Sequence, residues 1–269
     1  MNPTLAPPRT ALVTGGAPRL GRAIALALAA QGWDIAVHYH GSQDAALATV
    51  GEIQALGRKA LPVQLDLESA ADVTPLFEAC EAALGPVHCL VNNASLFEHD
   101  TAASFSVARF EAHMRTNVAA PVRLAVALRD RLPPDARGVV INLLDQKLWN
   151  PNPDFLSYTL SKSALEAATG LLARALAPQV RVVGVAPGIT LPAKGQTDAG
   201  FAAAHRANPL GRGSSPEDIA AAVVYLAHAP AVTGTTLIVD GGQHLHAGVL
   251  RGAHADQCCR ARTACPGAA

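Results

Sequence analysis

The sequence predicts a single-domain, doubly wound α/β fold over residues 10–246, and two observations support this prediction. Short apolar runs alternate with longer Ala/Leu-rich segments from residue 10 to about residue 240, a pattern typical of repeated βαβ units. The runs are nearly continuous in apolar residues, which favours a parallel sheet covered by helices on both faces. Seven strands are expected: TALVTG (10–15), DIAVHY (34–39), ALPVQLD (60–66), CLVNNA (89–94), GVVINLLD (138–145), VRVVGVAPG (180–188) and TLIVDGG (236–242).

Three stretches depart from this alternation. Residues 190–215 are rich in Gly, Ala and polar residues, so we expect an excursion above the sheet that serves as a substrate lid. Residues 1–9 are expected to be a flexible N-terminus. Residues 247–269 have no periodicity, and we expect a loosely ordered C-terminal tail.

Charge and composition restrict the function classes. The 269 residues are 50% hydrophobic, and 21 basic side chains balance 21 acidic ones. This balance gives no general attraction to nucleic acid or anionic lipid. No apolar stretch of about 18 residues is available to span a bilayer, and the first ten residues lack a secretory pattern. We therefore expect a cytoplasmic enzyme without nucleic-acid or membrane partners.

The five cysteines predict neither a metal site nor a disulfide framework. Cys80 and Cys89 fall in apolar segments, where a buried thiol behaves as a small hydrophobic side chain. The other three lie after residue 257 without paired metal-ligand spacing.

A glycine-rich turn, TGGAPRLG, follows the first predicted strand and precedes a helix-like segment. Gly15, Gly16 and Gly21 would let a phosphate approach backbone N–H groups at a helix N-terminus, although the turn could also be merely tight. Arg19 adds planar donors suited to phosphate oxygens. The position at the first strand-to-helix junction favours dinucleotide binding.

The end of the second strand, VHYHGSQD, indicates which dinucleotide. No carboxylate stands there to accept from an adenine ribose 2′-OH, because the positions are Tyr39 and His40. Arg19, His40 and Ser42 would instead accommodate a 2′-phosphate, which favours NADPH. His40 and Ser42, each taken alone, are better explained as ordinary polar loop residues.

Other polar residues are ambiguous alone. Asp66, at the end of the third strand, could accept from an adenine amino group or cap a helix. The asparagines of NNAS (92–95) tolerate a tight backbone. Asn117, within a helical stretch, is of a type usually solvated or bonded to backbone.

The stretch NLLDQKLWNPNPDFLSYTLSK places Tyr158 and Lys162 four residues apart, on one helix face, with Asp145 thirteen residues before the tyrosine. A free tyrosine has a pKa of about 10. We expect Lys162, with the positive ring of an oxidised nicotinamide, to lower that pKa and make Tyr158 a proton donor. Without the cofactor motifs, an exposed polar pair would be the simpler interpretation.

In order, TGGAPRLG, LDL, NNAS, Asn117, YTLSK and VAPG resemble the short-chain dehydrogenase/reductase family over roughly residues 9–245. The resemblance implies a Rossmann fold, with Asn117 as the structural asparagine, Tyr158 as proton donor and Lys162 as its partner. Arg19 replaces a usual glycine and Asp145 a usual serine, and both are similar to the pteridine reductase branch. HYHGS also resembles that branch's HYHRS, except that Gly41 replaces an arginine that contacts the cofactor phosphate.

Asp145 and Phe97 indicate the substrate class. An alkoxide developing during carbonyl reduction needs hydrogen-bond donors, which a serine offers and an ionised carboxylate does not. A carboxylate suits a substrate rich in N–H groups, or a relay that reprotonates the tyrosine. By resemblance, Phe97 would stack a pterin ring against the nicotinamide, although it could also be a core residue.

These arguments and the resemblance together predict three sets of residues. The catalytic set is Asn117, Asp145, Tyr158 and Lys162. The cofactor set is Gly15, Arg19, Leu20, Gly21, His40, Ser42, Asp66, Asn93, Ala94, Tyr158, Lys162, Pro187 and Gly188. The substrate set is Arg19, Ser95, Phe97, Asp145 and Tyr158.

The function predicted is NADPH-dependent reduction of a dihydropterin (dihydrobiopterin, dihydromonapterin or dihydrofolate) to the tetrahydro form. The alternatives are a reductase of another carbonyl or imine, and an NADP(H)-binding sensor without turnover. The resemblance also implies a homotetramer assembled through the helices that carry Asn117 and Tyr158.

Overall fold

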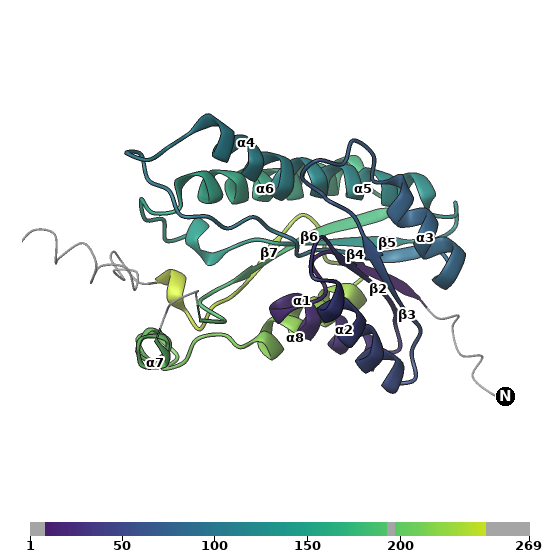
Figure 1. The fold of residues 1–269 in the computed structure, drawn as a ribbon, viewed down its shortest axis with the longest axis horizontal. Helices are drawn as coiled ribbons and strands as arrows, with labels where there is room; N and C mark the ends of the chain where they lie inside the picture. Colours follow the sequence, from purple (N-terminus) through teal and green to yellow (C-terminus); the bar gives the residue numbers. More distant parts are fainter. Residues whose placement is uncertain (1–8, 193–196, 246–269) are drawn as a thin grey trace, which may run out of the picture.

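The seven predicted strands form one parallel sheet, in the order β3-β2-β1-β4-β5-β6-β7 (Figure 1). The computed structural model describes residues 9–192 and 197–245. Every neighbouring pair of strands is parallel. The strands are β1 (Thr10–Val13), β2 (Asp34–Tyr39), β3 (Ala60–Gln64), β4 (Val87–Asn92), β5 (Gly138–Leu143), β6 (Val180–Pro187) and β7 (Thr236–Val239). The single-domain, doubly wound fold predicted from the sequence is confirmed.

Helices cover both faces of the sheet. In Figure 1, α1, α2 and α8 lie on one side of the strands, and α3, α4, α5 and α6 lie on the other. The helices are α1 (Arg19–Ala30), α2 (Gln43–Ala55), α3 (Thr74–Leu84), α4 (Val107–Met114), α5 (Ala120–Arg131), α6 (Leu156–Ala175), α7 (Asp198–Arg206) and α8 (Pro216–His228). Three short turns complete the described chain: a π-helical turn η1 (Arg115–Ala119) and the 3-10 turns η2 (Gln146–Leu148) and η3 (Gln243–Leu245).

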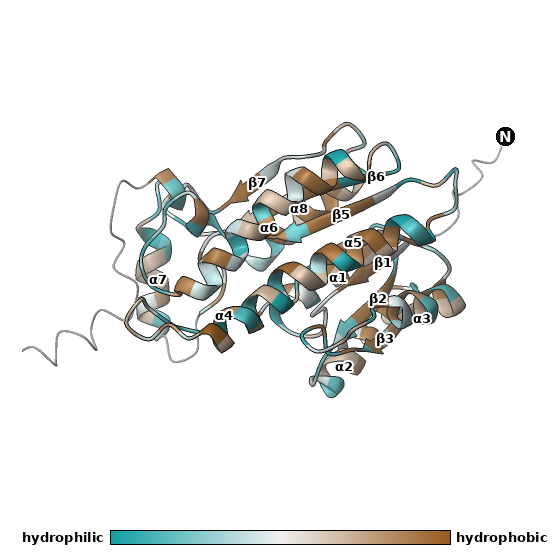
Figure 2. Ribbon diagram, turned by 90° about the horizontal axis from the view of Figure 1, so that it is seen from above, coloured by the Kyte–Doolittle hydropathy of each residue, from teal (hydrophilic) through white to brown (hydrophobic). Residues whose placement is uncertain are grey.

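The core consists of two apolar layers because successive strand residues point to opposite faces. On β1, Ala11 and Val13 pack in the layer under α1 and α8, whereas Leu12 packs in the layer under α3 and α5. Burying a side chain such as Leu12 contributes about 1.5–3 kcal/mol. Both faces are therefore closed, and the strands appear predominantly apolar in Figure 2 while the helices alternate between apolar and polar residues. Cys80 and Cys89 are buried and free, as predicted.

The strand order reverses next to β1, which lies between β2 and β4. In such folds the crevice at the carboxyl ends of the strands is where ligands bind. The turns after β1 to β6 open at this edge and carry most of the residues predicted for the site, while η1 carries Asn117 and α6 carries Tyr158 and Lys162. The sheet thus brings together motifs that are far apart in the sequence.

The predicted excursion over residues 190–215 contains a helix, α7, that the sequence analysis did not anticipate. Residues 193–196 of that excursion and the predicted tail, residues 247–269, lie outside the described residues. The lid role of the excursion stays a prediction. Within the two described ranges, no helix has the length and apolar character needed to cross a bilayer.

Candidate active site

The turn after β1 is tight because it has no side chains where the backbone folds back on itself. Gly15 has a φ of +57°, in the left-handed region that favours glycine. A Cβ on Gly21 would lie 2.0 Å from the carbonyl oxygen of Gly15, so only glycine fits there. The Asn93 side chain donates to the carbonyls of Thr14 and Gly15 at 3.0 and 2.9 Å, and Ala94 N–H donates to the Thr14 hydroxyl. The end of β4 therefore fixes the turn.

The helix that follows this turn has the properties of an anion site. The N-terminus of α1 has no side-chain cap and no acidic residue in its first turn, which includes Leu20. Its first N–H groups and the helix dipole therefore favour a bound anion such as a phosphate. Arg19, with a φ of +54°, stands at the start of the helix, and its guanidinium donates to the carbonyl of Pro192 at 2.9 Å. Arg19 thus connects the turn to the excursion after β6.

His38, which the sequence analysis did not single out, supports the same turn from β2. Its Nδ1 accepts the N–H of Gly15 at 3.1 Å, and its Nε2 donates to the carbonyl of Leu65 at 2.9 Å. Only 2% of the residue is exposed, and burial lowers its pKa from 6.5 to about 4. The neutral ring therefore holds a single tautomer. His38 could have been identified from the sequence as a polar residue within an otherwise apolar strand.

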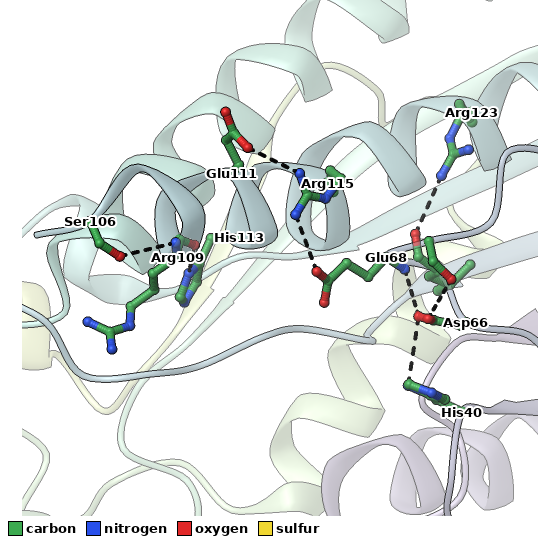
Figure 3. Close-up of polar contacts among 11 residues, drawn as sticks. His40, Asp66, Glu68, Ser106, Arg109, Glu111, His113, Arg115 and Arg123 are labelled. Atoms are coloured by element: carbon green, nitrogen blue, oxygen red, sulfur yellow. Dashed lines mark hydrogen bonds and ion pairs between the residues drawn. The ribbon is translucent and has the colours of Figure 1, made fainter.

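At the far end of the crevice, His40 and Asp66 face each other. His40 Nδ1 lies 3.8 Å from Oδ1 of Asp66, and 71% of the His40 side chain is exposed (Figure 3). Asp66 accepts from the Ser69 hydroxyl at 2.6 Å and from Glu68 N–H at 3.0 Å, and the first of these bonds is the main cause of its lowered pKa. Ser42 precedes α2 without a side-chain cap bond.

The alternative prediction that Asp66 caps a helix is therefore wrong, because Asp66 caps a turn instead. The bonds of Asp66 close a turn over residues 66–69, whereas α3 begins only at Thr74. Figure 3 also shows Arg115 reaching from η1 to Glu68, with Glu111 on its other side. The Asp66 side chain is 36% exposed, so an adenine amino group can still approach it.

Asn117 is completely buried in the π-helical turn η1 and uses all of its polar atoms. Its Oδ1 accepts from Leu96 N–H at 2.8 Å and from the Ser95 hydroxyl at 3.2 Å. Its Nδ2 donates to the Leu96 carbonyl and to the Ser161 hydroxyl, each at 2.9 Å. The solvated alternative is excluded. Asn117 fixes the loop after β4 against α6, and it does so from the kind of turn that often occurs at functional sites.

Asp145, Tyr158 and Lys162 meet at the carboxyl end of β5. The Tyr158 hydroxyl donates to Asp145 Oδ2 at 2.9 Å, and the N–H of Lys147 donates to Asp145 Oδ1 at 2.8 Å. Lys162 Nζ donates to the carbonyl of Leu143 at 2.7 Å and lies 5.7 Å from the centroid of the Tyr158 ring. Helix α6 provides the phenol and the ammonium on one face, as predicted.

Burial dominates the titration of this group. It raises the pKa of Asp145, and it raises the pKa of Tyr158 well above the usual 10, with the Asp145 carboxylate adding to the effect. It lowers the pKa of Lys162 to about 8. The lowering of the Tyr158 pKa was predicted for Lys162 together with an oxidised nicotinamide, and Lys162 without that ring does not produce it. The reason is that the ammonium bonds to Leu143 while the phenol faces a carboxylate.

Phe97 extends from the loop after β4 toward this group. The residue is 53% exposed, which excludes the core alternative. Its ring stacks on that of Phe155, with centroids 4.4 Å apart and planes at 9°, and meets the edge of Tyr158 at 4.6 Å. Phe155 was not identified from the sequence, and its position three residues before the tyrosine offered no pattern that distinguished it from a core residue.

The chain after β6 closes the crevice on the remaining side. Pro187 is the last residue of β6, and the N–H of Gly188 donates to the carbonyl of Val239 at 3.0 Å. A Cβ on Gly188 would lie 2.7 Å from that of Asp240, so the two segments approach more closely than a side chain permits. Every predicted site residue is among the described residues, and the turns that carry them share one edge of the sheet.

A sequence model of the family described as "Enoyl-(Acyl carrier protein) reductase" matches residues 16–244. A 3beta-hydroxysteroid dehydrogenase 1 from Eggerthella lenta is 35% identical over 89% of this chain and 95% of that protein. The solved structure of FolM alternative dihydrofolate reductase 1 from Brucella suis, in complex with NADP, is 41% identical, with a TM-score of 0.86 over 90% of this chain and 97% of that one. A blue fluorescent protein from a metagenomic library, in complex with NADPH, is 34% identical, with a TM-score of 0.79 over 88% and 98%.

Proposed function

The chain belongs to the short-chain dehydrogenase/reductase family of oxidoreductases, and from this premise we propose that it uses NADPH to reduce a dihydropterin to the tetrahydropterin. The substrate class comprises dihydrobiopterin, dihydromonapterin and dihydrofolate. The observation that carries the proposal is the bond between Tyr158 and a partly buried carboxylate, Asp145, at the position where the family usually has a serine.

The turn after β1 fits the cofactor. The glycine cradle at Gly15 and Gly21 and the uncapped start of α1 suit a pyrophosphate, while Arg19, His40 and Ser42 supply polar groups for a 2′-phosphate. The similar protein from Brucella suis is in complex with NADP. Bound here, the nicotinamide supplies the hydride. Gly41 leaves fewer donors for the 2′-phosphate, so the preference for NADPH over NADH is expected to be moderate.

Tyr158 holds the proton that the reaction consumes. Its raised pKa keeps the phenol protonated at neutral pH, and its hydroxyl is fixed by Asp145. When hydride reaches a ring carbon, the adjacent nitrogen takes the proton from Tyr158. Asp145, whose own pKa is raised, then takes a proton from solvent and passes it to Tyr158, or it accepts from an N–H of the ring. Lys162, one helical turn away, supplies a positive charge that offsets the buried carboxylate.

Phe97 supports a flat ring as the substrate. Its side chain is half-exposed beside Tyr158 while Phe155 covers part of it. An aromatic face at this place can stack a pterin ring within reach of the phenol. Arg19 and Ser95, at the two sides of the crevice, are expected to contact the ring's polar edge.

A carbonyl reductase is the second candidate, because a relative that is 35% identical is named as a hydroxysteroid dehydrogenase. Turnover assays with NADPH and a panel of dihydropterins, steroid ketones and small cyclic imines separate the candidates. We expect kcat/KM to be highest for a dihydropterin. A higher value for a ketone would overturn the proposal, and NADPH binding without any turnover would identify the sensor alternative. The homotetramer and the cytoplasmic location also stay predictions.

A further inference from the structure

Lys147, two residues after Asp145, has a buried ammonium that no step of the proposed reaction uses. The residue is only 9% exposed. Its Nζ donates to the side-chain oxygen of Asn152 and to the carbonyl of Asp154, and lies 5.5 Å from the centroid of the Phe155 ring. Burial lowers the pKa of Lys147, and the carboxylates of Asp145 and Asp154 act against that effect. A cation buried to this extent needs such partners to be tolerated.

The segment that Lys147 holds contains a backbone conformation that needs support. Phe155 has a φ of +57° and a ψ of +49°, in the left-handed region, which is rare for a bulky side chain. Lys147 bonds to the carbonyl immediately before Phe155. On the other side, the buried Asp100 accepts from Ser157 N–H at 3.0 Å, and its carbonyl accepts from Leu156 N–H at 3.3 Å. The segment around Phe155 is thus fixed at both ends.

From these contacts we infer that Lys147 is a positioning residue, which fixes Phe155 so that Phe97 presents a constant face to a flat ring substrate beside Tyr158. The chain of contacts runs from the ammonium to Phe155, from Phe155 to Phe97 through a 4.4 Å stack, and from Phe97 to Tyr158 at 4.6 Å. The inference rests on the proposed function for the identity of the ring. The ammonium of Lys147 donates to neither Asp145 nor Tyr158, and only the backbone N–H of the residue bonds to Asp145.

The test replaces the side chain of Lys147, and the hydrogen bond from its backbone N–H to Asp145 remains. Lys147→Met removes the charge and both donated bonds, and Lys147→Arg keeps a cation. Because losing an aromatic stack costs about 2–12-fold in binding, we expect Lys147→Met, which misplaces the Phe97 ring, to raise KM for the dihydropterin by up to about 10-fold. We expect kcat and the NADPH Kd to change less than about 3-fold, since the Tyr158–Asp145 bond and the cradle are retained and the Lys147 charge is the smallest of the influences on the Asp145 pKa. Lys147→Arg should restore most of the KM, and Lys59→Met, at an exposed position, should have no effect.

A double-mutant cycle identifies the route of the effect. If Lys147 acts through Phe155, then Lys147→Met in a Phe155→Ala background should raise KM no further. Additive effects would overturn the inference, and so would equal losses in KM, kcat and NADPH affinity, which indicate only general damage to the fold. If Lys147→Met does not fold, Lys147→Gln, which also removes the charge, replaces it in the same cycle.

A second measurement does not depend on the pterin. Hydrogen exchange is compared among wild type, Lys147→Met and Lys147→Arg at the amides of Leu156, Ser157 and Thr159, with the amides of α1 as the reference. We expect faster exchange only in Lys147→Met, because the N–H of Thr159 donates to the Phe155 carbonyl at 2.9 Å. Unchanged exchange would overturn the inference even if pterin turnover is found. Faster exchange in a protein that reduces no dihydropterin would refute the proposed function alone.

Discussion

The hydroxyl of Tyr158 donates a 2.9 Å hydrogen bond to Oδ2 of Asp145 at the end of β5, where the phenol is buried and the carboxylate is partly buried. Burial favours the neutral form of both acids. The Asp145 carboxylate raises the pKa of Tyr158 further, whereas the hydrogen bond that Tyr158 donates lowers the pKa of Asp145. The pair therefore retains a proton at neutral pH. Lys162 lies close enough for its charge to lower the pKa of Asp145, which limits how far burial raises it. A protonated phenol is the state that a reduction requires before hydride arrives.

Replacement of Tyr158 by phenylalanine should abolish turnover. The variant keeps the ring against Phe97 but removes the only proton that the chain is proposed to deliver. General acid catalysis contributes about 10²–10⁴-fold, so kcat should fall by that factor. The NADPH Kd, measured by fluorescence titration, should stay nearly unchanged because the substitution does not alter the glycine-rich turn after β1. An unaltered kcat would eliminate the proton-donor role.

Replacement of Asp145 by serine should change the substrate preference. Serine restores a donor for a developing alkoxide but removes the acceptor for ring N–H groups and the partner of Tyr158. We expect kcat/KM for the dihydropterin to fall about 100-fold or more, the size of effect seen when one transition-state contact is lost. Any activity on small ketones should fall less. The kcat/KM values for the dihydropterin and for the ketones are measured by steady-state kinetics in the variant and the wild type. Equal losses on the two substrates would contradict the role given to Asp145.

Replacement of Phe97 by alanine should weaken binding of the ring specifically. Aromatic stacking contributes about 0.5–1.5 kcal/mol beyond simple burial, so KM should rise at least about 2–12-fold. Phe105→Ala is the matched control, because Phe105 is also exposed, at 43%, and contacts Phe110 rather than Tyr158. KM for the dihydropterin is measured in both variants. Similar changes in the two would show that Phe97 contributes only general apolar surface.

Much of the fold followed from the sequence because it depends on local patterns. Continuous apolar runs such as GVVINLL can only be strands buried on both faces, and all seven formed in parallel. The spacing of Tyr158 and Lys162 likewise fixed their common helix face. The helix α7 escaped prediction because DAGFAAAHR lies in a Gly- and polar-rich stretch that resembles a loop.

The parts of the site that were not predicted depend on where side chains point. The sign of the Tyr158 pKa change depends on whether Lys162 faces the phenol or the Leu143 carbonyl, and spacing does not distinguish the two. Phe155 stacks on Phe97 from a left-handed backbone, a state that the sequence around it does not demand. His38 was hidden in an apolar strand, although a polar residue with no solvent to face must find partners.

His38 should make the stability of the protein depend on pH in a defined window. Its pKa is 6.5 in an unfolded chain and about 4 in the fold. As pH falls from 6.5 to 4, the unfolded chain takes up a proton that the folded protein does not, so the free energy of unfolding decreases. The two pKa values correspond to about 3 kcal/mol of stability, present above pH 6.5 and lost by about pH 4. Protonation would also turn Nδ1 from an acceptor into a donor facing the Gly15 N–H.

His38→Gln removes this titration while keeping a neutral side chain with donor and acceptor atoms. Urea unfolding at several pH values between 4 and 7 should show the wild type losing about 3 kcal/mol more than the variant over that range. His40→Gln is the control, since that side chain is 71% exposed and its charge is the smallest of the three influences on the His38 pKa, so most of the pH dependence should remain. Parallel curves for wild type and His38→Gln would mean that His38 titrates alike in the folded and unfolded chains. The turn after β1 would then not rely on a neutral imidazole.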